Sequence, residues 1–189
     1  MATAFRSLRR TPAASARARR PAATLEEVLA YRNPRVIRGF LRDYDLPAAE
    51  TRLLFREMLK LLWITNRSSG RFAIWTPWVP LDHMWHWFVL HTEDYAAFCE
   101  RYFGRMLHHD PETRGTRLNR GLAAGAEWAC AEYERAVRGA IDLTWEELGQ
   151  ETAQRWFGDF WARYTPEFLE QHRRRASAVA PSYTLANAA

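Results

Sequence analysis

Residues 81–111 read LDHMWHWFVLHTEDYAAFCERYFGRMLHHDP, and this stretch decides how the rest of the chain is interpreted. It contains five of the six histidines and one of the two cysteines. Leu81 to Leu90 is apolar almost all round, so a helix formed here must be buried on most of its circumference. Its few polar side chains are therefore the first candidates for a functional site.

Asp82 and His86 are four residues apart, which places both on one face of this predicted helix. A carboxylate one turn before an imidazole can hold one ring nitrogen and leave the other free. Asp82 and His86 are accordingly the candidate catalytic residues, with His86 as the base and Asp82 orienting it.

A second helix is predicted from Thr92, as its cap, to about Leu107, and Pro111 prevents its continuation. The tight corner between the two helices can bring candidate ligands of a divalent metal such as zinc or iron together: Asp82, His86, Cys99, His108 and His109. A purely structural alternative stays open, because Cys99 also suits a core and the chain has no HExxH or CxxC motif.

A spaced pattern in this stretch resembles the conserved core of the glycine-rich domain-containing protein-like family. It consists of Asp82-x-x-Trp85-His86, Thr92-x-x-Tyr95, Phe98-Cys99, Tyr102-Phe103-Gly104 and His108-His109-x-Pro111. The resemblance implies a small bacterial protein consisting of little beyond one helical domain, and it assigns no reaction. The chain departs from the plant form of the pattern at Phe88, where that form has a histidine.

The composition predicts one domain in a reducing compartment. With 189 residues, 48% hydrophobic and nine tryptophans, the chain can bury a core. Two cysteines do not make a disulfide framework, so we expect a cytoplasmic location. Nine of the 27 basic residues lie at the two ends of the chain, which leaves 18 basic against 22 acidic residues between them. A mildly acidic body argues against specific nucleic-acid binding.

Helix signals recur along the rest of the chain. A capping box at Thr24–Glu27 opens a helix to about Tyr31, and Asn33-Pro34 opens the next. A longer helix from Leu46 to about Ile64 contains too many charges to cross a membrane. Later helices are predicted at residues 123–140, at 144–164 from a second capping box, and at 165–175.

These signals predict an all-α fold, a single irregular bundle of about six to eight helices over residues 24–175. Residues 1–23, rich in arginine and alanine, and residues 176–189 are expected to be disordered tails. The apolar, proline-containing segment 65–80 is expected either to cover the core or to supply a binding surface.

Two functions compete. In the first, the chain is an interaction or accessory protein that binds another protein through an aromatic surface at Trp75, Trp78, Trp85 and Tyr95. In the second, it is a metal-binding protein or metal-dependent enzyme that uses Asp82, His86, Cys99, His108 and His109. No phosphate-binding loop or dinucleotide fingerprint favours another class of enzyme.

Overall fold

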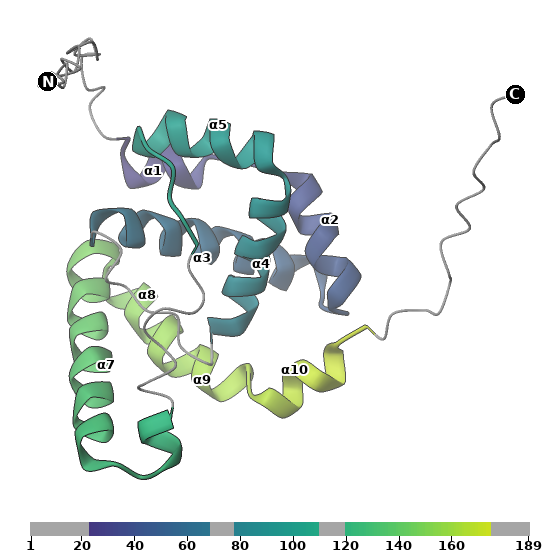
Figure 1. The fold of residues 1–189 in the computed structure, drawn as a ribbon. Helices are drawn as coiled ribbons and strands as arrows, with labels where there is room; N and C mark the ends of the chain where they lie inside the picture. The colour runs from purple at the N-terminus through teal and green to yellow at the C-terminus, as the bar shows by residue number, and fades with distance from the viewer. Residues whose placement is uncertain (1–22, 69–77, 110–119, 175–189) are drawn as a thin grey trace, which may run out of the picture.

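The computed structural model describes residues 23–68, 78–109 and 120–174, and these residues form helices without a strand. The predicted all-α fold is confirmed (Figure 1). The helices are α1 (Leu25–Leu29), α2 (Pro34–Asp43), α3 (Ala48–Arg67), α4 (Val79–Leu90), α5 (Thr92–Phe103), α7 (Glu127–Leu148), α8 (Gln150–Gln154), α9 (Phe160–Arg163) and α10 (Pro166–His172). The predicted tails, apart from Ala23, lie outside the described residues.

Three of the predicted helix starts are present with their caps. The Thr24 hydroxyl accepts from the backbone N–H of Glu27, and the Glu27 carboxylate accepts from the backbone N–H of Thr24. Asn33 caps α2, which begins at Pro34. Thr165 caps α10 in the same way. Such caps satisfy backbone donors that the first turn of a helix leaves without a partner.

Helix α3 is the centre of the fold. It contacts α1, α2, α4 and α7, and most of its residues from Leu54 to Thr65 are buried. Figure 1 shows α1 and α5 on one side of α3, with α8 and α9 on the other. Most of its buried residues are apolar, as expected of a helix that is surrounded on several sides.

Helices α4 and α5 meet at a corner, and its geometry differs from the prediction. The joint is His91, which ends α4 and precedes α5, and no side chain caps the start of α5. Helix α5 ends at Phe103 and not near Leu107, because Gly104 adopts a left-handed conformation with φ of 67°. Glycine takes this conformation without steric cost, so it terminates the helix and turns the chain back.

The predicted capping box at Thr144 is wrong. Thr144 lies inside α7, fully buried, and its hydroxyl donates to the carbonyl of Ala140 at 2.7 Å. The break between α7 and α8 comes at Gly149, whose φ is 82°. A threonine followed three residues later by glutamate can therefore continue a helix where tertiary packing favours it.

A buried ionic network joins α3 to the C-terminal helices. The Glu57 carboxylate, fully buried, accepts from Lys60 Nζ at 3.0 Å, Arg155 Nη1 at 3.0 Å and Trp156 Nε1 at 2.9 Å. Arg155 and Trp156 lie in a π-helical turn, Arg155–Asp159, between α8 and α9. Lys60 Nζ also donates to the Thr152 hydroxyl at 2.9 Å. Each buried charge thus has partners, as a buried charge requires.

In the part of the chain that the structure describes, no helix combines the length and the apolar character needed to cross a membrane.

Candidate metal centre

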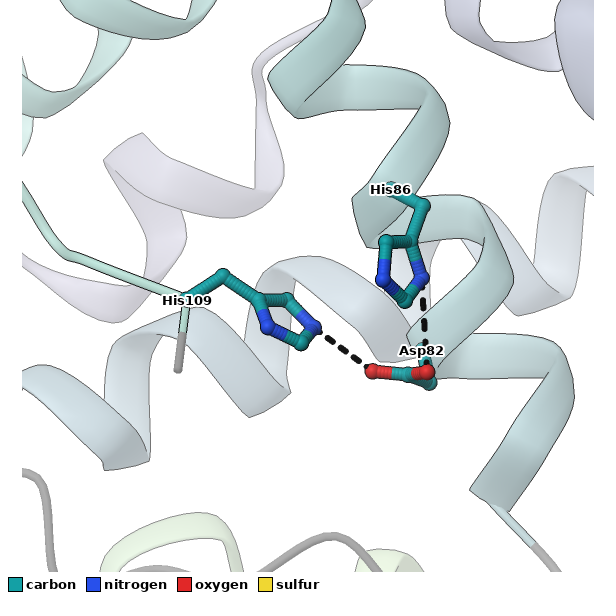
Figure 2. Close-up of side chains that lie close together, drawn as sticks. All are labelled: Asp82, His86 and His109. Carbon is teal, nitrogen blue, oxygen red and sulfur yellow. Dashed lines mark hydrogen bonds and ion pairs between the residues drawn. The ribbon is translucent and has the colours of Figure 1, made fainter. Parts of the chain in front are cut away.

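Three candidate ligands meet on one side of α4. Asp82, His86 and His109 each offer a ligand atom, and these atoms lie within 4.8 Å of one another. Nε2 of His109 is 2.7 Å from Oδ1 of Asp82, and Nδ1 of His86 is 3.3 Å from Oδ2. Figure 2 shows one oxygen of the carboxylate directed at each imidazole. Two imidazoles and one carboxylate are a ligand set that both zinc and ferrous iron use.

Two of these residues owe their proximity to helix geometry. Asp82 and His86 are one turn apart on α4, as the sequence predicts. The side chain of Asp82 is 22% exposed and that of His86 is 46% exposed. The site is therefore open to solvent through His86, while the carboxylate is partly covered.

His109 lies in a different segment of the chain, after α5. After Gly104, the chain runs back from the end of α5 past α3 toward α4 (Figure 1). Leu107 is buried, and its carbonyl accepts from the Tyr95 hydroxyl, which in turn accepts from Trp85 Nε1 at 3.0 Å. The His109 ring then packs on Trp85, with centroids 4.3 Å apart, and on His86, at 4.5 Å.

Two predicted ligands are not part of this group. Cys99 is 1% exposed in the core, where its thiol interacts with Tyr95 and the Leu107 backbone, and burial raises its pKa. His108 is exposed, next to His109 in sequence. Among the described residues, the potential metal ligands that come together are Asp82, His86 and His109. The prediction that Cys99 and His108 join them is not supported by these positions.

The structure buries three of the four residues of the predicted aromatic binding surface. Trp78, Trp85 and Tyr95 are at most 4% exposed. The Trp78 indole donates to the Trp156 carbonyl at 3.0 Å, and the Trp85 indole donates to Tyr95. Buried indoles need such partners, and having them allows these rings to serve as core. Trp75 lies outside the described residues.

A second histidine environment, not predicted from the sequence, lies beside the site. His83 Nδ1 is 2.5 Å from the Tyr44 hydroxyl at the end of α2, and the two rings stack. Burial lowers the pKa of His83. In the sequence, the only indication of this environment is the position of His83 on α4, three residues before His86. That spacing did not reveal the contact with Tyr44, since the two residues are 39 positions apart.

A comparison with family models identifies the family of this chain. The UCP032817-like family model matches residues 26–157, more than two thirds of the 189 residues. A search of curated proteins and a search of solved structures each found no match. The match overturns the resemblance to the glycine-rich domain-containing protein-like family, whose pattern depended on a few spaced residues within about thirty positions. The match contains all three clustered ligands, and the chain belongs to the UCP032817-like family.

Proposed function

We propose that this protein binds one divalent metal ion, zinc or ferrous iron, through Asp82, His86 and His109. The observation that carries the proposal is the convergence of these three ligand types from two separate segments, with their atoms within 4.8 Å. A simple salt bridge would place only one imidazole beside Asp82. Here the carboxylate has an imidazole at each oxygen.

Two of the distances between ligand atoms are close to those around a zinc ion. Nitrogen and oxygen ligands bind zinc at about 2.0–2.2 Å, so two ligands of a tetrahedral ion lie roughly 3.3–3.6 Å apart. The distance between Asp82 Oδ2 and His86 Nδ1 is 3.3 Å. The 2.7 Å between Asp82 Oδ1 and His109 Nε2 is a direct hydrogen bond, so His109 Nε2 would lose the shared proton and move outward by roughly 0.6–0.9 Å.

The exposure of the ligands favours an open site. Three protein ligands leave a coordination position for water or substrate, which is the arrangement of catalytic zinc sites, whereas structural sites have four. His86, with 46% of its side chain exposed, is the ligand that solvent reaches. The proposal therefore extends to a metal-dependent activity, with water or a substrate as the further ligand.

The metal-free alternative, with His86 as a general base oriented by Asp82, has weaker geometric support. A well-formed N–H···O bond measures about 2.7–3.2 Å, and the distance from His86 to Asp82 is 3.3 Å. The imidazole that Asp82 orients closely is that of His109, which is only 11% exposed. The accessible ring and the well-oriented ring are thus different residues.

Metal content tests the proposal directly. Untagged protein, purified anaerobically and reconstituted separately with Zn²⁺ and Fe²⁺, is expected to retain about one equivalent of one ion by elemental analysis. Asp82→Asn and His109→Ala should each weaken binding at least about tenfold, since each removes a ligand. His108→Ala is the matched control, because His108 is exposed and outside the group. Substoichiometric metal after both reconstitutions, or equal losses in the two histidine variants, would refute the proposal.

The interaction or accessory function has less support, because three of the four residues of its predicted surface, Trp78, Trp85 and Tyr95, are core residues. We retain a cytoplasmic location as a proposal, supported by the two unpaired cysteines, Cys99 and Cys130. Fractionation of cells that express the full chain tests it, and recovery outside the cytoplasmic fraction would contradict it.

A further inference from the structure

A pocket of about 240 Å³ is lined by His86 but not by Asp82 or His109. Its walls come from the end of α2, with Asp43 and Tyr44, and from α4, with His83, His86 and Trp87. Arg173, just after α10, completes it. His86 belongs both to the pocket and to the candidate metal centre. A ligand in this pocket would therefore lie next to the proposed ion.

Backbone pairing fixes Arg173 at the rim of this pocket. Tyr44 and Arg173 form an isolated antiparallel bridge, with Asp45 N donating to His172 O and Arg174 N donating to Asp43 O, both at 2.7 Å. Successive side chains of an extended segment point to opposite sides. Arg174 accordingly turns to Asp45, which it binds at 2.6 Å, and Arg173 lines the pocket.

The charges around the pocket leave Arg173 available for a ligand. Within the described ranges, its guanidinium makes no ion pair and no side-chain hydrogen bond, although Asp43 lines the same pocket. The Asp43 carboxylate accepts from Trp87 Nε1 at 2.6 Å, and the Tyr44 hydroxyl is bonded to His83. The Asp43 carboxylate and the Tyr44 hydroxyl therefore have hydrogen-bond partners among the other residues that line the pocket.

We infer that this pocket binds a small organic carboxylate, with its anionic group on Arg173 and its other end beside His86. Guanidinium groups bind carboxylates through two parallel hydrogen bonds, which gives geometric as well as energetic selectivity. At about 30 Å³ for each water-sized group, 240 Å³ holds roughly eight of them. That volume can accommodate a short dicarboxylate such as succinate. The contact with the metal rests on the proposed function, whereas the contact with Arg173 does not.

Calorimetric titration with acetate, malonate, succinate and glutarate tests the inference, with succinamide as the neutral control for succinate. At least one acid should bind saturably to the zinc-loaded protein, and succinamide should not. Arg173→Gln should weaken that binding at least about tenfold, and Arg173→Lys should restore only part of it, because lysine lacks the planar fork. Arg174→Gln is the matched control, since Arg174 binds Asp45. No binding by any of the four acids, or equal binding by the two glutamine variants, would overturn the inference.

Metal analysis of the same samples separates this inference from the proposed function. Arg173→Gln should retain the metal content of the unmodified chain, because Arg173 is not one of the clustered ligands. Full metal content without carboxylate binding refutes only the pocket. Carboxylate binding that is equally tight with and without the ion refutes the contact between ligand and metal. Failure to bind metal refutes the proposed function, and the comparison of Arg173→Gln with Arg174→Gln still decides the pocket.

Discussion

Oδ1 of Asp82 and Nε2 of His109 lie 2.7 Å apart, although 27 positions separate the two residues in the sequence. The contact depends on Tyr95, whose hydroxyl links the Trp85 indole on α4 to the Leu107 carbonyl in the returning segment. Arg105 adds a second attachment, since its guanidinium donates to the side chain and the backbone carbonyl of Asn66 at the end of α3. The candidate site is thus held by residues that contribute no ligand.

Tyr95→Phe should destabilise the fold and weaken metal binding together. The change leaves the buried Trp85 indole and Leu107 carbonyl without their partner, which costs about 1–3 kcal/mol for such groups. Chemical denaturation measures the loss, and titration with Zn²⁺ measures the effect on the site. Tyr102→Phe is the control, because Tyr102 is buried on the same helix and its hydroxyl has no side-chain hydrogen bond among the described residues. Equal stability of the two variants would show that the hydroxyl of Tyr95 positions nothing.

Gly39→Ala should destabilise the protein by about 1–3 kcal/mol. A Cβ atom at Gly39 would lie 2.3 Å from the Trp87 ring, so this ring or the helices α2 and α4 would have to shift. Gly139→Ala is the matched control on α7, where nothing lies within 4 Å of the added atom. That change should stabilise the chain by about 0.5–1 kcal/mol through helix propensity. Thermal unfolding of both variants checks the prediction, and a shift in the same direction would contradict it.

Glu57→Ala should be among the most damaging single changes in the chain. It removes the carboxylate that accepts from Lys60, Arg155 and Trp156, and breaking a buried ionic network of this kind costs about 3–5 kcal/mol. Glu146→Ala, at an exposed position of α7, should change the free energy of unfolding by less than about 0.5 kcal/mol. Denaturant midpoints of the two variants provide the comparison. A loss at Glu57 no larger than at Glu146 would mean that the network adds no net stability.

The stability that Glu50 contributes to the fold should be lost in acid. The hydrogen bonds from Arg163, at 2.6 and 2.7 Å, hold the pKa of the Glu50 carboxyl below 4.5, and Tyr164 adds to the effect. Because the pKa is lower in the folded state, this stabilisation is complete above about pH 4.5 and is lost as the pH falls through the folded-state value. Glu50→Gln should therefore be less stable than the unmodified chain at pH 7. Unfolding curves between pH 7 and pH 2 should converge at the acid end, and a constant difference would contradict this cause.

Several features follow from short-range sequence signals and agree with the structure. The capping residues Thr24, Asn33 and Thr165 precede helices that begin where they predict. Asp82 and His86 share a face of α4 because four residues make about one turn of any α-helix. Each of these features depends on a few neighbouring residues, so local chemistry is sufficient to predict it.

The composition of the site depends on tertiary structure. His109 joins Asp82, whereas Cys99 packs in the core and His108 faces solvent, and all three are compatible with the spacing along the chain. The difference comes from the left-handed turn at Gly104 and from the attachment of Leu107 to Tyr95. The sequence by itself determined an all-α fold, its capped helices and the pairing of Asp82 with His86. Only the packing of helices against one another decided which distant imidazole completes the group, because helical periodicity sets directions along one helix and not the path of the chain between helices.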